Sequence, residues 1–439
     1  MPAAPPYRAA ARAHRTWRLI AGAVVALVAL GSIDLAFDLA LAQEDDQPDS
    51  SQDRSADESS ATCPCCTYRT VVCEKDEQPV KNDLAACGKG IAPDPTLVRF
   101  AVIGDFGYSK YKCEAVVSKM VQAWHQQQPL DFVVTVGDDN YNSGKQTTIK
   151  RNIADHYDNF VRDKKFFPTL GNHDWGTVRK EGDYVWGTPY PYLDYFDYLK
   201  QYSPNAQPPV QGRYYNVQPS PLVELFGLDS DYHEQDGTCC NSKQAGWLRG
   251  ALAASKAPWK LVYFHHPPYT TAREDAPGAW MRWPFKQWCA TSVLSGHEHA
   301  YERLEIEGMP YFVNGLGGNP WLYDQKGCAV QPGSQKRFNG AHGAMLVVAN
   351  SREMEFCLYS VKQKAPVDVY RQKVPQGCVP AAADCQPSPA VASYCAMQPP
   401  TSEPDEPACP TDWPGPAQGR TAASYCAVPI DHKSRNREQ

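Results

Sequence analysis

The central part of the chain lacks a cluster of basic residues, and the whole sequence carries a formal net charge of −6 at pH 7. Proteins that bind nucleic acids neutralise phosphates with grouped Lys and Arg side chains, so we expect no nucleic acid partner. With 439 residues and 42% apolar content, the chain can bury one large core with smaller appendages.

The N-terminal region lacks an apolar run long enough to cross a membrane, because the run at residues 19–31 is shorter than the roughly 20 residues required. Arginines precede this run, and Ala40-Leu41-Ala42 provides small residues for cleavage, which predicts a signal peptide at residues 1–42. Asp34 and Asp38 lie in the cleavage region, so an uncleaved anchor is the alternative. We expect a secreted or periplasmic protein with no stable membrane insertion unless this segment stays uncleaved.

Cysteine is abundant, with 16 residues, which is typical of exported proteins in which disulfides persist. Cys63-Pro64-Cys65-Cys66 resembles a metal-binding knuckle, but the predicted export favours disulfides. Five cysteines precede the central part, six lie in it and five follow it. Because two odd sets cannot both pair internally, full oxidation requires at least one bridge to leave each flank. We expect the flanks to clasp the central part or each other, and to stabilise rather than catalyse.

Composition divides the mature chain into segments. Residues 43–62 are acidic and Ser-rich without apolar spacing, which predicts a disordered linker. The segments expected after it are a Cys-rich segment at 63–95, a catalytic domain at 96–374 and a Pro- and Cys-rich tail at 375–439. In the tail, Ala-Ser-Tyr-Cys-Ala occurs at residues 392–396 and again at 423–427. Two copies are too few to indicate a solenoid.

Strand-like and helix-like patterns alternate through the first part of this domain. Short apolar runs predict strands at residues 98–103, 132–136, 166–170, 260–264 and 292–294 and, later, at 311–313 and 344–348. Apolar residues at helical spacing predict helices near residues 117–124, 149–160 and 244–254. Alternation of this kind indicates an α/β core with helices outside the sheets.

Side chains that can bind metal follow five of these strands. The segments are Gly104-Asp105-Phe106-Gly107, Gly137-Asp138-Asp139-Asn140-Tyr141, Gly171-Asn172-His173-Asp174, His265-His266-Pro267-Pro268-Tyr269 and Gly296-His297-Glu298-His299. Ligands of open α/β folds bind beyond the carboxyl ends of strands, so the five segments could converge. Asp, Asn, His and Tyr donors suit Fe, Zn or Mn. Each segment alone could be a turn, a surface loop or a core histidine, but all five in this order favour a two-metal site.

The order GD-x-G, GD-x-x-Y, GNHD, H-x-P-x-Y and GH-x-H resembles the calcineurin-like metallophosphoesterases and, within them, the purple acid phosphatases. The sequences AYER at residues 300–303 and GLGGN at 315–319 strengthen the resemblance, which covers residues 97–361 and neither flank. Most metallophosphoesterases have a histidine two residues after the first aspartate. That position is Gly107 here, and Tyr141 can fill the vacancy, as in the purple acid phosphatases.

This resemblance implies a fold and a set of metal ligands. The fold is an α/β metallophosphoesterase-type β-sandwich flanked by helices (αββα), with the disulfide-rich flanks as appendages. One metal would be bound by Asp105, Asp138, Tyr141 and His299. The other would be bound by Asn172, His265, His297 and the shared Asp138. Three anionic donors favour Fe(III) in the first set and a divalent Fe, Zn or Mn in the second. In the alternative, Tyr141 only packs and both sites hold divalent zinc or manganese.

The resemblance also implies a reaction. Two metals would clamp a phosphoryl group and lower the pKa of a bound water, whose hydroxide attacks phosphorus. His173 would steer phosphate and protonate the leaving oxygen, Asn172 would also face the substrate, and His266 is a phosphate-contacting candidate. We expect an acid phosphatase acting on small phosphomonoesters. The alternatives are phosphodiester or nucleotide hydrolysis on the same metals, and a non-catalytic binding protein.

A long insertion between the third and fourth segments is rich in aromatic residues. Most of them are expected to pack onto the domain, while some could line the substrate entrance, as could Trp280 and Trp283. The roles of Asp231, His233 and the adjacent Cys239 and Cys240 are not readable from the sequence.

Overall fold

The computed structural model describes residues 68–396, apart from residues 93, 176, 181–182, 187–188, 204–210, 272–277, 326–327, 381–384 and 386. The predicted signal peptide, the acidic linker, Cys63, Cys65, Cys66 and the second Ala-Ser-Tyr-Cys-Ala copy lie outside the described residues. Within the described part of the chain, no helix is long and apolar enough to cross a membrane.

Two mixed β-sheets form the core. One sheet has the strand order β17-β16-β15-β2-β3-β4, and the other has the order β14-β11-β12-β10-β9-β8-β7. The strands of the first are β2 (Val98–Ile103), β3 (Phe132–Thr135), β4 (Phe166–Phe167), β15 (Gly343–Ala349), β16 (Glu353–Ser360) and β17 (Asp368–Lys373). Those of the second are β7 (Tyr215–Ser220), β8 (Val223–Gly227), β9 (Trp259–Tyr263), β10 (Ser292–Ser295), β11 (Tyr301–Ile306), β12 (Met309–Asn314) and β14 (Ser334–Phe338).

Alternating side chains pack the two sheets face to face. On β9, Trp259, Leu261 and Tyr263 lie in the large apolar cluster that also contains β2, β3 and β15 side chains. The intervening Val262, and Phe264 just after the strand, lie in a second cluster with the side chains of helix α5 (Lys243–Ala254). This period of two is the reason why one sheet can bury both of its faces, one against the other sheet and one against a helix.

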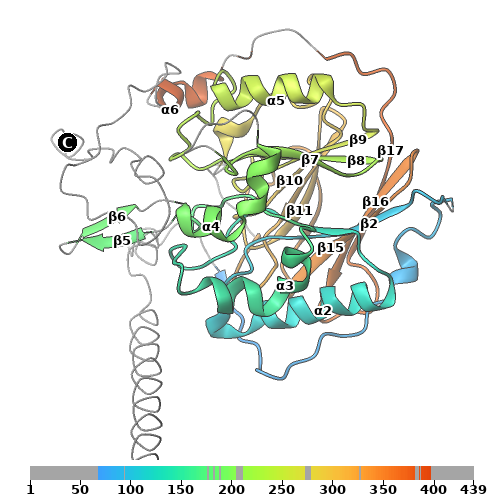
Figure 1. Cartoon of the computed structure of the whole chain (residues 1–439). Coiled ribbons are helices and arrows are strands. Elements are labelled where there is room, and N and C mark those ends of the chain that lie inside the picture. Colours follow the sequence, from blue (N-terminus) through green and yellow to red (C-terminus); the bar gives the residue numbers. More distant parts are fainter. Residues whose placement is uncertain are drawn as a thin grey trace, which may run out of the picture. The chain divides into compact units, whose positions relative to one another are not determined.

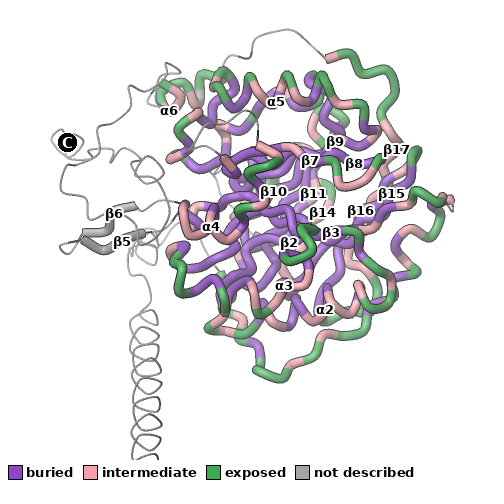
Figure 2. Tube along the Cα trace, viewed as in Figure 1, coloured by how far each residue is buried: buried purple, intermediate pink, exposed green. Residues whose placement is uncertain are grey.

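Helices cover the outer faces of both sheets. Helix α2 (Cys113–Gln127) buries Val117, Met120, Val121 and Trp124, which share one helical face. Helix α3 (Asp155–Arg162) lies beside α2, and α5 covers the opposite sheet (Figure 1). Figure 2 shows the sheets as buried and the outward sides of these helices as exposed. The αββα sandwich expected from the sequence is therefore confirmed.

Parallel pairing places the carboxyl ends of several strands at one edge. Strands β2, β3 and β4 run parallel in one sheet, and β8, β9 and β10 run parallel in the other. The five metal-binding segments predicted from the sequence follow β2, β3, β4, β9 and β10. The sandwich therefore brings loops from both sheets to a common edge.

The structure differs from the sequence predictions in some elements. Strand β4 is shorter than the expected 166–170 because Pro168 has no N–H to donate to a ladder, and its carbonyl accepts from the Tyr215 hydroxyl at 2.7 Å. The helical stripe at 149–160 is divided into a π-turn (Lys150–Ala154) and α3. Strands β7 and β8, in the aromatic insertion, were not expected.

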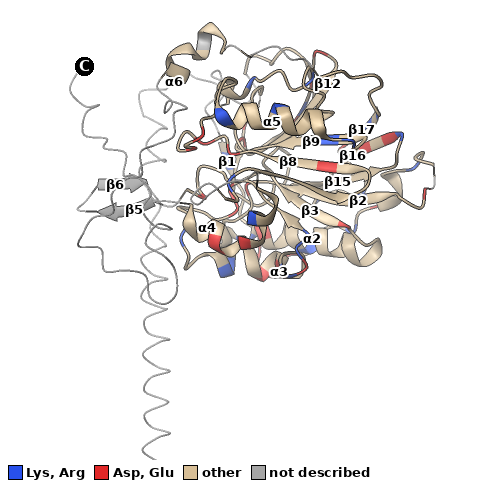
Figure 3. Cartoon of the chain, turned by 45° about the horizontal axis from the view of Figure 1, so that its top comes forward, with Lys and Arg blue, Asp and Glu red and all other residues tan. Residues whose placement is uncertain are grey.

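Smaller elements complete the described chain. The short strands are β1 (Tyr68–Thr70), which pairs with β13 (Trp321–Tyr323), and β5 (Thr177–Lys180), which pairs with β6 (Asp183–Trp186). The short helices are η1 (Leu84–Ala86), η2 (Ser109–Tyr111), α4 (Tyr190–Tyr195), η4 (Asp197–Tyr202), η5 (Ala279–Met281), η6 (Pro389–Val391) and α6 (Ala392–Ala396). Acidic and basic residues are interspersed over the helices (Figure 3).

Disulfides attach both flanks to the central domain. From the N-terminal side, Cys73 pairs with Cys113 and Cys87 with Cys357. From the C-terminal side the pairs are Cys239–Cys395, Cys240–Cys385 and Cys289–Cys378. Each flank thus sends bridges into the domain, and the predicted clasp is confirmed for these cysteines. The boundaries at residues 96 and 374 remain predictions.

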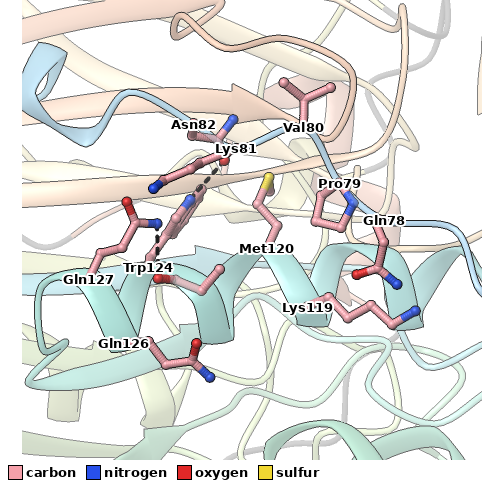
Figure 4. A pocket seen from close by; sticks show the side chains of 11 residues that line it. Gln78, Pro79, Val80, Lys81, Asn82, Lys119, Met120, Trp124, Gln126 and Gln127 are labelled. Carbon is pink, nitrogen blue, oxygen red and sulfur yellow. Dashed lines mark hydrogen bonds between the residues drawn. The ribbon is translucent and has the colours of Figure 1, made fainter.

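The N-terminal segment also packs along helix α2. Residues 78–82 and the α2 side chains line a groove of about 340 Å³ (Figure 4). At its base the Trp124 indole N–H donates to Asn82 Oδ1 at 2.8 Å. This contact and the Cys73–Cys113 bridge hold the segment against the helix.

Candidate metal centre

Two buried aspartates stand at the ends of neighbouring strands. Asp105 follows β2 and Asp138 follows β3, both in the left-handed backbone region, with φ of 56° and 55°. Asp is among the few residues that tolerate this conformation. The Asp105 N–H donates to the Gly137 carbonyl at 3.0 Å, which ties the two turns together. Both carboxylates are fixed where the sheets meet, and both are buried.

The Tyr141 hydroxyl gathers the first predicted set of ligands. It donates to Asp138 Oδ2 at 2.8 Å and lies 3.3 Å from Asp105 Oδ1 and 3.2 Å from His299 Nε2. The other ring nitrogen of His299, Nδ1, lies 2.8 Å from the Trp321 carbonyl. A carbonyl partner of this kind holds the Nδ1 proton and leaves Nε2 as the donor toward a metal. All four residues of this set therefore converge.

The second predicted set lies on the other side of Asp138. Asn172 Oδ1 is 3.0 Å from His265 Nε2 and 3.1 Å from His297 Nδ1. His265 Nε2 is also 3.3 Å from Asp138 Oδ2, and its Nδ1 lies 2.9 Å from the Val136 carbonyl. Asp138 thus touches both sets, as a bridging carboxylate must.

Glycines make room for this arrangement. A Cβ on Gly171 would lie 2.2 Å from Asp138 Oδ1, and one on Gly296 would lie 2.5 Å from Asp105 Oδ2. Any side chain at these positions would displace a carboxylate. The glycines of GNHD and GHEH therefore shape the centre as much as the ligands do.

The pKa shifts of the residues at the centre indicate which protons a metal cation would replace. Burial alone would raise the pKa of Asp138, but His265 and His173 hold it well below its usual range. Burial would lower the pKa of His265, but Asp138 outweighs it and raises that pKa to about 10. Burial and the two aspartates raise the pKa of Tyr141 well above its usual value. A proton on His265 thus offsets part of the aspartates' negative charge, and the Tyr141 proton is donated to Asp138. These donors fit cations that take the place of those protons.

A further carboxylate supports the turns from behind. Asp174 accepts hydrogen bonds from the Gly171 N–H at 2.9 Å and the Asp139 N–H at 3.1 Å. Burial, together with Asp138, raises the pKa of Asp174 to about 7. Asp174 therefore joins the GNHD turn to the GDDNY turn.

The two histidines assigned to substrate lie at the rim of the centre. The His173 N–H donates to Asp138 Oδ1 at 2.9 Å, and its ring lies 4.3 Å from the Tyr141 ring between centroids. The His266 ring lies 4.6 Å from the His297 ring, and its Nδ1 is 2.9 Å from Ser230 Oγ. One nitrogen each of His265, His266 and His297 lie within 4.8 Å of one another.

The sequence did not reveal that the loop after a sixth strand, β8, also contributes to the site. The loop after β8 carries Ser230, which holds His266, and Asp231, whose Oδ1 lies 2.6 Å from His233 Nδ1. The His233 ring stacks on Trp175 with centroids 5.3 Å apart. The apolar residues of β8 were the available signal, because a parallel neighbour of β9 must end at the same edge.

The tryptophans considered for the substrate entrance have different surroundings. Trp283 is buried in the apolar cluster under α5, and its indole N–H donates to the Thr238 and Trp280 carbonyls. Trp280 is half-buried and lies next to His266, with ring centroids 5.5 Å apart. Trp283 is therefore a core residue, whereas Trp280 stands beside the centre.

Comparison with known proteins agrees with this geometry. Residues 98–301 match the family model of the calcineurin-like phosphoesterases. Purple acid phosphatase 17 of Arabidopsis thaliana is 23% identical over 287 residues, covering 60% of this chain and 81% of that protein. Tartrate-resistant acid phosphatase type 5 of Mus musculus is 26% identical over 254 residues, covering 52% of this chain and 74% of that protein.

The solved structure of purple acid phosphatase PPD1 from seeds of yellow lupin (Lupinus luteus) is similar to this chain, with a TM-score of 0.47 and 15% sequence identity. The match covers 63% of this chain and 54% of the lupin chain. The sequence matches to the Arabidopsis and mouse enzymes extend over most of those proteins, and the family-model match at residues 98–301 includes all five ligand-bearing strand ends. A dinuclear metal centre is a property of that family. Residues 98–301 therefore form a calcineurin-like phosphoesterase domain, and the chain is a metal-dependent phosphoric ester hydrolase of the purple acid phosphatase type.

Proposed function

We propose that the protein is an exported acid phosphatase that hydrolyses phosphomonoesters at two metals held by Asp105, Asp138, Tyr141, Asn172, His265, His297 and His299. The observation that carries this proposal is the convergence of all seven donors into two groups that share Asp138. The disulfides to both flanks support an oxidising compartment, secreted or periplasmic.

When bound, two cations would neutralise the phosphoryl oxygens and supply an activated water at neutral or acid pH. The chain's own residues would do the rest. His173 sits beside Tyr141 with its N–H on Asp138, from where its ring would orient phosphate and give a proton to the leaving oxygen. Asn172 would contact both the second metal and the substrate. His266, held by Ser230, would bind a phosphate oxygen from the opposite rim.

The two groups of donors differ in charge, which supports different metals. Asp105, Asp138 and Tyr141 offer three oxygen donors that can be anionic, whereas Asn172, His265 and His297 are neutral donors. Hard anionic oxygens favour the higher charge, so we assign Fe(III) to the Tyr141 group and a divalent Fe, Zn or Mn to the other.

Removal of the shared ligand tests the two-metal proposal. We expect Asp138→Asn and His297→Ala each to lower kcat/KM for a phosphomonoester by several orders of magnitude and to lower the metal content. Asp158→Asn is the matched control, because Asp158 is half-buried on α3 and its described ion pair is with exposed Arg162 at 2.9 Å. Near-normal turnover by Asp138→Asn would refute the assignment.

The same assay separates the competing functions. The protein is given p-nitrophenyl phosphate, bis-p-nitrophenyl phosphate and a nucleotide under identical metal loading. Faster hydrolysis of the monoester supports the proposal, and a preference for the diester or the nucleotide replaces it with the corresponding activity. Metal binding without hydrolysis of any ester would indicate a binding protein.

A further inference from the structure

We propose that Tyr394, in the C-terminal segment, is a positioning residue of the active site, which acts through Trp280 and Ser230 on His266. This inference rests on the proposed function, because it is His266 that we assign to phosphate. The sequence led us to expect only stabilisation from this flank. The contacts below show a continuous line of touching residues from the flank to the rim of the metal centre.

The outermost contact is an aromatic stack. The rings of Tyr394 and Trp280 have centroids 4.7 Å apart and planes tilted by 25°. The Tyr394 hydroxyl lies 3.1 Å from Thr238 Oγ1. The Thr238 carbonyl in turn accepts from the Trp283 indole at 3.1 Å. Tyr394 therefore fixes one face of Trp280 and is itself held to a loop anchored in the core.

The next contacts lead from Trp280 to the centre. The Trp280 indole N–H donates to the Ser230 carbonyl at 3.0 Å, and its ring lies 5.5 Å from that of His266. Ser230 Oγ accepts from the His266 backbone N–H and lies 2.9 Å from His266 Nδ1. The placement of the His266 ring is thus set by Ser230 and Trp280 together, and Trp280 is set by Tyr394.

Covalent bonds hold Tyr394 in place. Helix α6 has five residues, Ala392–Ala396, too few to be stable alone. Cys395, next to Tyr394, is bonded to Cys239, and Cys385 is bonded to the adjacent Cys240. Two bridges from neighbouring cysteines fix the segment at two points. This double attachment gives the pair Cys239-Cys240, uninterpreted in the sequence, a role in the site.

The chain provides a matched control for this residue. Tyr394 stands in Ala-Ser-Tyr-Cys-Ala at 392–396, and Tyr425 stands in the same five residues at 423–427. We compare Tyr394→Ala, Tyr394→Leu and Tyr394→Phe with Tyr425→Ala in the full-length, oxidised, metal-loaded protein. The measurements are KM and kcat for p-nitrophenyl phosphate, the inhibition constant of inorganic phosphate, and amide hydrogen exchange of peptides covering residues 228–233 and 278–283.

An aromatic stack contributes about 0.5–1.5 kcal/mol, which corresponds to about a 2- to 12-fold change in an equilibrium constant. We therefore expect Tyr394→Ala and Tyr394→Leu to raise KM and the phosphate inhibition constant by roughly 2- to 12-fold, with a smaller change in kcat. Exchange should become faster in both peptides. Tyr394→Phe keeps the ring and loses only the hydroxyl contact with Thr238, so its constants should lie nearer to the wild-type values than those of either variant without the ring. Tyr425→Ala should leave the constants unchanged.

The experiment distinguishes a wrong positioning role for Tyr394 from a wrong proposed function. If Tyr394→Ala and Tyr394→Leu lower only the melting temperature, with constants and exchange unchanged below it, the positioning role is wrong and the segment only stabilises. An equal effect of Tyr425→Ala also overturns it. If the wild-type protein hydrolyses no phosphate ester, the proposed function fails, and the exchange data still decide whether Tyr394 orders the 228–233 loop.

Discussion

At the residue scale, the hydroxyl of Tyr141 lies at the meeting point of Asp105, Asp138 and His299. We expect iron-loaded wild-type protein to be pink or purple, because a phenolate bound to Fe(III) absorbs visible light. Tyr141→Phe removes this oxygen and little volume, so the variant should lose the band. The measurement is a visible spectrum at known iron content. An unchanged band in Tyr141→Phe, or a colourless iron-loaded wild type, would favour two divalent ions and a tyrosine that only packs.

His173 is the other single residue with a separable effect. If its ring protonates the leaving oxygen, His173→Ala should slow the hydrolysis of alkyl phosphates by about 10²–10⁴-fold. Esters of good leaving groups such as p-nitrophenol should be affected far less, since they depart without a proton. Metal content should not change. An equal loss for both kinds of ester would mean that His173 positions phosphate and transfers no proton.

At the element scale, the turns after the strands decide the geometry of the centre. We expect Gly171→Ala to lower metal content and activity strongly, because its Cβ would stand 2.2 Å from Asp138 Oδ1. Gly246→Ala is the matched control, since Gly246 lies within α5 and a Cβ there would meet nothing within 4 Å. That substitution should raise the free energy of unfolding by about 0.5–1 kcal/mol. Thermal melts and metal analysis of both variants check the pair.

Strands and helices with a clear pattern of apolar residues could be predicted from the sequence. The strands at β2, β9 and β10 and the helix α5 were placed within a residue or two, because short apolar runs mark the strands and apolar residues at helical spacing mark the helix. Strand β8 was missed, and the partner of its buried Glu224, the side-chain amide of Asn216 that donates to it at 2.7 Å, lies on β7 and is identified only by the fold. The loop with Ser230 was therefore not recognised as a sixth contributor to the site.

Residues that lie close in sequence can still differ in ways that only the fold decides. Trp280 and Trp283 are three positions apart, yet one stands beside His266 and the other is buried under α5. The ligand set was predictable because each ligand belongs to a short motif at a strand end. The residues that orient the ligands, such as the Trp321 and Val136 carbonyls, have no sequence signal.

At the scale of the whole molecule, disulfides join both flanks to the β-sandwich. The Cys87–Cys357 bridge spans 270 residues and is buried against β15 and β16. We expect the Cys87→Ala, Cys357→Ala double variant to lose about 2–5 kcal/mol of unfolding free energy, measured by urea denaturation without reductant. Its KM and kcat at 25 °C should stay at wild-type values, since neither residue touches the centre. A raised KM would contradict this division between a stabilising N-terminal flank and a positioning C-terminal one.

The position of the disulfide-forming cysteines along the chain affects the order in which parts of the active site are completed. Every predicted metal ligand lies before residue 300, whereas Cys378, Cys385 and Cys395 are synthesised later. A nascent chain can therefore carry the complete ligand set while the segment that holds Tyr394 is still absent, and a reduced chain carries that segment unattached. If Tyr394 positions His266, the last gain in phosphate affinity follows the formation of these bridges. The reduced chain would then hydrolyse phosphate esters with a KM roughly 2- to 12-fold higher than the oxidised chain, so the redox state of its surroundings would tune its affinity for substrate.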